Sequence, residues 1–182
     1  MVDYFAILHR YIPPESETYA IYLPHVAAVT AKALRIARRL GLSAARQRFI
    51  EEAAMLHDIG IVNVDAPSMG CAGDLPYLAH LSEGRRILEQ AGLPRHALVA
   101  ERHVGAGIPR AEVLAQNLPL PPRDFIPQTL EEQIISWADL FFRKLPGQLW
   151  RELEIAEVRA QVAKYGPRAA RVFESWAAKF SD

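Results

Sequence analysis

Residues 53–61 read AAMLHDIGI, an apolar run of helical character that ends in His57 and Asp58. His57 follows Ile50 by seven residues and Ala53 by four, so the imidazole falls on the apolar face of the predicted helix. An imidazole and a carboxylate buried side by side cost free energy unless both have partners, and a bound cation is one such partner. A His–Asp hydrogen bond at a helix end in the core is the alternative that the dipeptide alone leaves open.

Helical periodicity extends to both sides of this run. A helix is predicted over residues 18–40, because apolar residues recur there every three or four positions and Gly41 then ends it. Ser43 is the predicted N-cap of the helix that carries the run, and Thr129 begins another with a capping box. The other predicted helices lie at about 3–11, 81–91, 94–104, 148–164 and 167–180.

Two segments lack this periodicity. Residues 61–79 contain two prolines and are predicted to be an irregular excursion with one short helical turn, and the stretch from Gly105 to Pro127 is predicted to be a loop. Strand-like alternation of useful length is not found. The sequence therefore predicts an all-α, single-domain helical bundle over residues 1–182, with a core at about 18–145 between an N-terminal helix (3–11) and a C-terminal helical pair (148–180).

Composition restricts the function classes. Half of the 182 residues are apolar (51%), which suits a folded domain, and 21 Lys+Arg balance 21 Asp+Glu, so no net charge indicates a nucleic-acid polymer or a membrane surface as the partner. We expect no membrane span, since no apolar run approaches 18 residues. The single cysteine, Cys71, agrees with a cytoplasmic location.

Two further residues place metal-binding groups in apolar surroundings. His25 borders the apolar stripe of the helix predicted over 18–40, and Asp139 lies within the otherwise apolar segment ISWADLFF. A lone carboxylate among such neighbours needs an ionic partner, a capping role or a metal. Together with His57 and Asp58, three separate helices each contribute metal-binding groups, the pattern of a metal site inside a helical bundle.

These residues resemble those of a known family. The order His25, then His57 and Asp58, then Asp139 is similar to the H…HD…D pattern of the HD superfamily of metal-dependent phosphohydrolases, which are all-α proteins. The resemblance covers about residues 18–145. The runs LPRHALVAERHVGAG (93–107), NLPLPPRD (117–124) and TLEEQIISWADLFFRK (129–144) resemble a branch of small bacterial and archaeal HDIG proteins.

The resemblance implies a metal-ligand set and a metal class. In HD proteins with two metals, two additional histidines lie between the HD pair and the last Asp, and His80 and His103 match them. One ion is then held by His25, His57, Asp58 and Asp139, the other by His80 and His103, with Asp58 bridging. Four imidazoles and two carboxylates suit divalent Fe, Mn, Co, Ni or Zn. Capping or surface roles for His80 and His103 remain the alternative.

The implied activity is hydrolysis of a phosphomonoester or phosphodiester of a small, nucleotide-like phosphorylated molecule by a metal-activated water. Two alternatives keep the metals: a di-iron oxygenase that cleaves a C–C or C–P bond, resembling myo-inositol oxygenase, and a non-catalytic metal-bound sensor. On the hydrolase interpretation, Asp58 orients the water besides bridging the ions.

Several charged residues are candidates for contact with the substrate. Lys32 lies seven residues after His25 and Arg143 four after Asp139, so both are candidate catalytic cations, although Lys144 rather than Arg143 matches the HDIG branch. Solvated surface charges are the alternative for all of them. The candidate substrate-binding residues are Arg102, Lys144 and Asp65. The loop of Asp65, Ser68 and Cys71 is expected to cover the pocket, and His9 and His96 are expected to be solvated.

Overall fold

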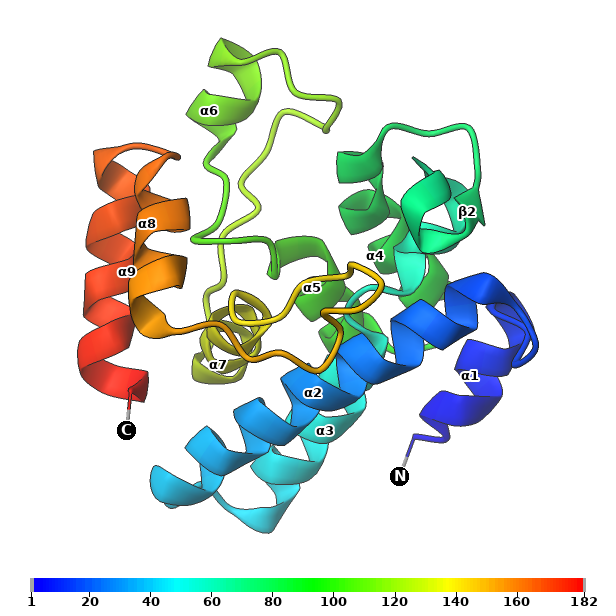
Figure 1. The fold of residues 1–182 in the computed structure, drawn as a ribbon, viewed down its shortest axis with the longest axis horizontal. Helices are drawn as coiled ribbons and strands as arrows, with labels where there is room; N and C mark the ends of the chain where they lie inside the picture. Colours follow the sequence, from blue (N-terminus) through cyan, green and yellow to red (C-terminus); the bar gives the residue numbers. More distant parts are fainter. Residues whose placement is uncertain (1, 182) are drawn as a thin grey trace.

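Helices form almost the whole framework of the computed structural model, which describes residues 2–181. The helices in chain order are α1 (Tyr4–Tyr11), α2 (Glu17–Arg39), α3 (Ala44–Leu56), α4 (His80–Gln90), α5 (Pro94–Arg102), α6 (Arg110–Ala115), α7 (Leu130–Asp139), α8 (Ile155–Ala163) and α9 (Pro167–Phe180) (Figure 1). The predicted all-α class is confirmed. None of the described helices combines the length and the apolar character needed to cross a membrane.

Capping residues explain where the central helices begin. The Ser43 hydroxyl accepts a hydrogen bond from the backbone N–H of Arg46 at the start of α3 (3.4 Å), and Thr129 accepts one from the N–H of Glu132 at the start of α7 (3.2 Å). Gly41 has a positive φ of 65° just after α2, a conformation that costs glycine little. Each of these starts and ends was predicted from the sequence.

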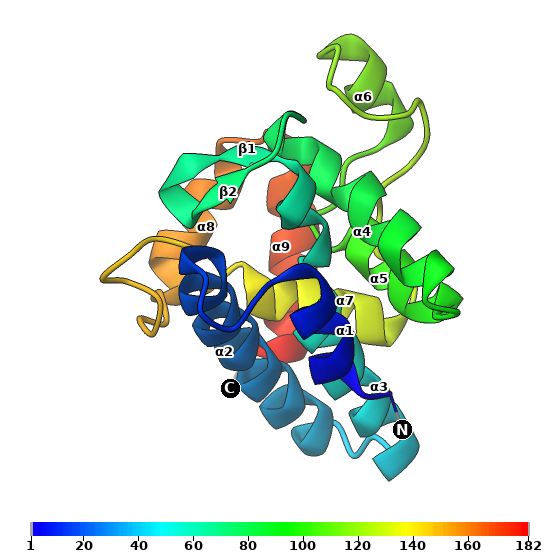
Figure 2. The same ribbon diagram turned by 90° about the vertical axis from the view of Figure 1, so that its right-hand side faces the viewer.

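In the described chain the helices enclose two large apolar clusters and a small third one made of Leu81, Val113 and Phe125. Helices α2 and α3 pack side by side, α7 packs on α2, and α4 packs on α5 (Figures 1 and 2). One cluster surrounds Trp137 of α7, whose ring centroid lies 5.0 Å from that of Phe173 in α9. The second large cluster includes Leu56 of α3 and Leu88 of α4. The C-terminal pair α8–α9 therefore contributes to the same apolar cluster as the central helices.

The excursion between α3 and α4 is more ordered than the sequence indicates. It contains three short 3₁₀ segments, η1 (Ile59–Asn63), η2 (Pro67–Met69) and η3 (Tyr77–Ala79), and two strands, β1 (Asp65–Ala66) and β2 (Cys71–Ala72). The strands pair antiparallel with Asp65 opposite Ala72. Elements of two or three residues lack the periodicity that would reveal them in a sequence. The segment packs on α2 through η2 and on α4 through η1 and η3.

The structure corrects two predictions: one helix was missed, and another begins later than predicted. The stretch predicted as a loop from residue 105 to 127 contains α6, six residues long, which projects at one end of the molecule in Figure 2. Helix α8 begins at Ile155 and not at 148. The backbone N–H of Leu153 instead donates to the carbonyl of Phe141 (2.9 Å), and Glu157 accepts a hydrogen bond from the N–H of Glu154 (2.9 Å) in a capping box.

Candidate metal centre

Six histidine and aspartate side chains from five parts of the chain meet in the interior. His25 lies within α2, and Asp139 is the last residue of α7. The other four lie at element ends: His57 and Asp58 after α3, His80 at the start of α4, and His103 after α5. All are buried except Asp139, whose side chain is 14% exposed. The structure therefore brings together every residue of the ligand set that the resemblance implied.

Four of the six form the first group of potential ligand atoms. His25 Nε2 lies 3.0 Å from Asp139 Oδ1 and 3.3 Å from Asp58 Oδ2. His57 Nε2 lies 3.3 Å from the same Asp58 oxygen and 3.5 Å from the same Asp139 oxygen. One ligand atom from each residue lies within 4.8 Å of all the others. Two imidazole nitrogens and two carboxylate oxygens therefore point at one place, as the ligands of a single cation do.

The second group shares Asp58 with the first. His103 Nε2 lies 3.3 Å and His80 Nε2 3.7 Å from Asp58 Oδ1, the oxygen that the first group leaves free. Because each oxygen of this carboxylate faces a different pair of imidazoles, Asp58 has the position of a bridge between two cations.

Three of the imidazoles are oriented by the backbone carbonyl three residues earlier. In each case the Nδ1 nitrogen lies within hydrogen-bond distance of that carbonyl oxygen: His57 of Ala54 (2.7 Å), His80 of Tyr77 (2.6 Å) and His103 of Ala100 (2.9 Å). A carbonyl can only accept, so Nδ1 carries a proton in each ring. When such a ring is neutral, as metal binding requires, Nε2 has a free lone pair. Metal-binding histidines are held in this way.

Unsatisfied polar atoms test whether the site fits a metal. Within residues 2–181, both ring nitrogens of His25, the Nε2 atoms of His57 and His80, and Asp58 Oδ1 are buried without a hydrogen-bond partner. Buried polar atoms in this state are costly and rare, and here they converge. Divalent cations would satisfy them, and the donor set of imidazole and carboxylate suits transition metals. The residues therefore fit two such ions.

The electrostatics of the cluster reflect crowded carboxylates. Burial by itself lowers the pKa of His57, but the carboxylates of Asp58 and Asp139 outweigh it and raise the pKa to about 10. Burial likewise opposes ionisation of Asp58, yet the charges of Lys144 and His57 hold its pKa well below the usual range. Burial lowers the pKa of His80 to about 3, so this ring is neutral at physiological pH. The two ionised carboxylates are therefore balanced by a protonated His57 and by the Lys144 ammonium, and a divalent cation held by His57 would replace its Nε2 proton.

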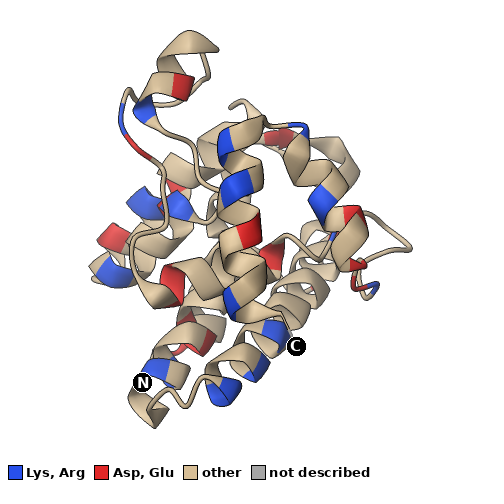
Figure 3. Ribbon diagram, turned by 90° about the vertical axis from the view of Figure 1, so that its left-hand side faces the viewer, with Lys and Arg blue, Asp and Glu red and all other residues tan. Residues whose placement is uncertain are grey.

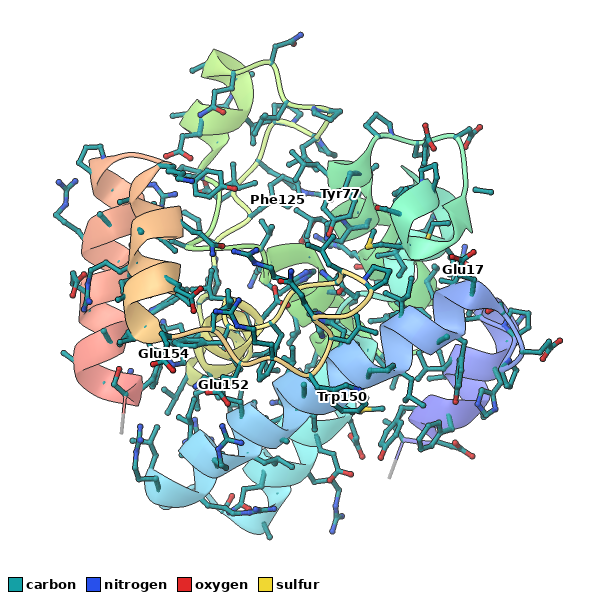
Figure 4. All side chains as sticks on the ribbon, in the orientation of Figure 1. Glu17, Tyr77, Phe125, Trp150, Glu152 and Glu154 are labelled. Carbon is teal, nitrogen blue, oxygen red and sulfur yellow. The ribbon has the colours of Figure 1, made fainter. Side chains whose placement is uncertain are left out.

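Lys144 is the cation that the structure places at this centre. Its Nζ lies 2.6 Å from Asp58 Oδ2, and it donates a hydrogen bond to the hydroxyl of Tyr77 (3.4 Å). The Lys144 side chain is 15% exposed, and Tyr77 is 40% exposed. Together with Asp139, these two residues connect the buried imidazoles to the surface. Tyr77, labelled beside α4 in Figure 4, also contacts His80, with ring centroids 4.7 Å apart.

The structure does not bring the other candidate charges to the cluster. Lys32 Nζ lies 2.5 Å from Glu152 Oε1, and Arg102 Nη1 lies 3.4 Å from Glu132 Oε2. Asp65 is exposed on the small hairpin. In the described chain Arg143 forms no ion pair with the six residues. Lys144 is therefore the one substrate-contact candidate that lies against the cluster, and the spacing from Asp139 that favoured Arg143 was misleading because α7 ends at Asp139.

His96 corrects a further prediction. It was expected to be solvated, but it is 7% exposed, and its Nε2 lies 3.3 Å from Glu52 Oε2. Its ring contacts that of Phe49 edge-on, with centroids 4.9 Å apart. A histidine in the first turn of a helix gave no indication of these partners, which come from α3. His9 is exposed, as predicted, and lies 3.1 Å from the Tyr19 hydroxyl.

Tyr77 and Gly60 are two residues of the site that sequence reasoning missed as functional. The backbone carbonyl of Tyr77 orients the His80 ring, and its position three residues before His80 is the signal in the sequence that could have indicated this contact. Gly60 lies so close to α4 that a Cβ atom there would be 2.0 Å from the His80 carbonyl oxygen and 2.4 Å from the backbone nitrogen of Gly84. The glycine of the HDIG run is therefore required for space, because it lets η1 pack directly against the helix that carries His80.

The fold and the His/Asp constellation define the class of the protein. The family model for the HD domain matches residues 22–143, and the chain belongs to this family. The matched range includes all six cluster residues, from His25 to Asp139.

Individual relatives and solved structures show the same likeness. A tRNA (cytidine(56)-2'-O)-methyltransferase of Picrophilus torridus is 32% identical over 142 residues, which are 72% of this chain and 37% of that protein. Its namesake from Thermoplasma volcanium is 34% identical over 119 residues (65% and 30%). An uncharacterized protein of Methanocaldococcus jannaschii is 40% identical over 86 residues (47% and 43%). This chain spans about a third of the length of the two methyltransferases.

Among solved structures, the HD domain of the Listeria monocytogenes phosphodiesterase PgpH is similar to this chain with a TM-score of 0.54 and 14% sequence identity, covering 97% of this chain and 95% of the other. At this identity the similarity establishes the fold. A second structure of that domain is in complex with cyclic-di-AMP and aligns equally well, with a TM-score of 0.54.

Proposed function

We propose that this protein is a metal-dependent phosphohydrolase with a dinuclear centre, acting on a phosphomonoester or phosphodiester of a small, nucleotide-like molecule. The observation that carries the proposal is the pair of ligand groups that share Asp58 through different oxygens. Membership in the HD family supports the same class of chemistry. Two cations held close together around one carboxylate suit in-line displacement at phosphorus.

The protein residues have separable roles in this proposal. His25, His57, Asp58 and Asp139 would hold one divalent ion, and Asp58, His80 and His103 the other. Such ions supply a hydroxide near neutral pH and positive charge for the phosphoryl oxygens. Asp58 orients the attacking water. Lys144 neutralises a phosphate oxygen, because its ammonium already lies 2.6 Å from an anionic oxygen at the exposed side of the cluster. No protein nucleophile is needed.

The comparisons suggest which substrates to test first. Cyclic-di-AMP is bound to the HD domain of PgpH in the second solved structure, so nucleotides with phosphodiester bonds are reasonable first candidates here. The methyltransferase name belongs to proteins of which this chain spans about a third, and methyl transfer is not proposed for this chain.

Metal analysis combined with a phosphate-release assay tests the proposal. The purified protein is treated with a chelator, reloaded with Mn²⁺, Fe²⁺, Co²⁺, Ni²⁺ or Zn²⁺, and assayed on p-nitrophenyl phosphate, bis-p-nitrophenyl phosphate, nucleoside monophosphates and cyclic dinucleotides. We expect hydrolysis that requires metal and is abolished by His57→Gln. His9→Gln, which removes an exposed imidazole, should retain the activity.

Other outcomes favour the alternative chemistries. A mixed-valent di-iron signal in electron paramagnetic resonance, with oxygen consumption and no phosphate release, would replace the hydrolase with an oxygenase. Stoichiometric metal binding with neither phosphate release nor oxygen consumption would support the interpretation as a non-catalytic metal-bound sensor.

A further inference from the structure

A cavity lies beside α9, away from the metal centre. It has a volume of about 380 Å³ and lies between α9 and the segments that contain Ala106 and Pro127. Its apolar walls include Ile126, Val172 and the indole of Trp176. None of the six residues of the metal centre lines it, so it is a separate site. Figure 3 shows the side of the molecule on which α9 faces the viewer.

The charged residues of this cavity are all cationic. Arg168, Arg171 and Lys179 line it, and no aspartate or glutamate does. Arg171 has no hydrogen bond or ion pair within residues 2–181. The Lys179 ammonium lies over the ring of Phe180, 5.3 Å from its centroid, and it has no carboxylate partner in the same range. In a chain with zero net charge, two unpaired cations at one concave site favour an anion there.

Neutral donors supplement the cations. The side-chain amide of Gln133 and the hydroxyl of Ser175 line the same cavity, and neither uses a hydrogen-bond partner in the described chain. The cavity therefore presents an apolar wall with a few polar and positive groups, which is the usual composition of a small-molecule site, and its volume falls in the usual range.

We propose that this cavity binds a small organic phosphate monoester. Its phosphate, with a charge near −2 at neutral pH, would be balanced by Arg171 and Lys179, and its flat or apolar body would pack on Trp176. This site is independent of the phosphohydrolase proposal, because it uses none of the metal-centre residues.

Arg168 connects this cavity to the segment that follows a metal-centre residue. It donates hydrogen bonds to the carbonyls of Ala106 (3.1 Å) and Gly107, and its Nε donates to Glu112 (2.8 Å). Ala106 and Gly107 are three and four residues after His103. Ala106 also lines the cavity, so a ligand there would lie against the backbone that follows His103, and we expect its binding to change the amide environments of Ala106 and Gly107.

Phenyl phosphate is a suitable probe, titrated into the chelator-treated protein at low ionic strength. Calorimetry gives the affinity, and ¹H–¹⁵N correlation spectra locate the site. We expect perturbation of the Trp176 indole N–H and of the Ala106 and Gly107 amides. The double variant Arg171→Gln/Lys179→Gln should weaken binding about tenfold or more, because two charge-assisted contacts are lost.

A matched double variant controls for the change in net charge. Arg38→Gln/Lys164→Gln removes two exposed cations outside the cavity, and it should leave the affinity within about twofold of the wild type. Inorganic phosphate, which lacks the apolar body, should bind more weakly than phenyl phosphate.

Three results would overturn the proposal. One is equal weakening in the two double variants, which would indicate non-specific attraction. Another is a set of perturbed resonances confined to the metal-centre residues. The third is equal affinity for phenyl phosphate and inorganic phosphate, which would remove the role of Trp176. None of these measurements depends on catalysis, so the phosphohydrolase proposal succeeds or fails separately.

Discussion

Asp58 is the residue on which the metal centre depends most. Its Oδ2 lies 3.3 Å from His57 Nε2 and 2.6 Å from Lys144 Nζ, and its Oδ1 lies 3.3 Å from His103 Nε2. His57 and Asp58 could be identified from the sequence because a polar pair on an apolar helix face is conspicuous. Lys144 could be named as a candidate from the sequence, but its position relative to the cluster could not be predicted. The chain beyond Asp139 is not helical, so residue spacing there does not indicate which way a side chain points.

The role of Lys144 in the proposed reaction can be tested by removing its charge. We expect Lys144→Met to lower kcat/KM about 10- to 100-fold on the best substrate found, because a charge-assisted contact with phosphate is lost. Metal content should not fall, as Lys144 is not a ligand. Arg143→Gln is the matched control, with the same change in charge one residue earlier, and should retain activity within about threefold. Equal losses in both variants would contradict the assignment.

His96 gives a pH-dependent contribution to stability. Burial lowers its pKa from 6.5, while the Glu52 carboxylate opposes this effect and Arg95 adds to it. The unfolded chain therefore takes up a proton at His96 at higher pH than the folded chain does, and the free energy of unfolding falls as the pH drops below about 6.5.

Substitution of His96 isolates this contribution. The difference in unfolding free energy between wild type and His96→Gln, measured by urea denaturation, should be constant above about pH 7. Between about pH 6.5 and 5, the wild type should lose stability relative to the variant. His9→Gln serves as the exposed control, with a difference that we expect to be flat. A flat difference for His96→Gln as well would contradict the effect of burial.

At the scale of elements, long helices were predictable and short ones were not. The 23-residue α2 shows its apolar period clearly, and its predicted limits differ from the observed ones by one residue at each end. The six-residue α6 has too few turns to show any period. The segment before α8 was misassigned because Leu149 and Leu153 have helical spacing, whereas the capping box at Glu154 and Glu157 marks the actual start.

The contact between η1 and α4 depends on Gly60. We expect Gly60→Ala to lower the free energy of unfolding by about 3 kcal/mol, because a Cβ atom 2.0 Å from the His80 carbonyl oxygen forces the two elements apart. Metal affinity should fall too, since His80 belongs to α4. Urea denaturation and metal titration measure the two effects.

Gly92→Ala is the control for this substitution. A Cβ atom at Gly92 meets nothing within 4 Å, and only the positive φ of 74° opposes it, at a cost of about 1 kcal/mol. If both variants lost the same stability, the close approach of η1 to α4 would not be the reason for the glycine.

For the molecule as a whole, the metal centre joins two apolar clusters. Ala138, adjacent to Asp139, belongs to the cluster around Trp137, whereas Leu56 and Ile59, which flank His57 and Asp58, belong to the other. A metal bound here would therefore couple parts of the core that are otherwise distinct.

Metal should consequently stabilise the entire fold. Added to chelator-treated protein at about 100 times its Kd, a suitable divalent ion should contribute about 2.7 kcal/mol, which raises Tm by roughly 5–10 °C for a chain of this size. Differential scanning calorimetry measures the shift.

Variants of the two ligand groups separate the contributions of the two ions. His25→Gln should remove the part of the Tm increase due to the first group, and His103→Gln the part due to the second. An increase of the same size in both variants and in the wild type would show that the ion binds elsewhere.

The carbonyls of Ala54 and Ala100, which orient His57 and His103, belong to the last turns of α3 and α5. Terminal turns are the parts of a helix that open most readily, and opening here would release the imidazole from its acceptor. The bound ions would thus suppress fraying, and the rate at which they dissociate would be limited by how often these two turns unwind rather than by ligand exchange alone.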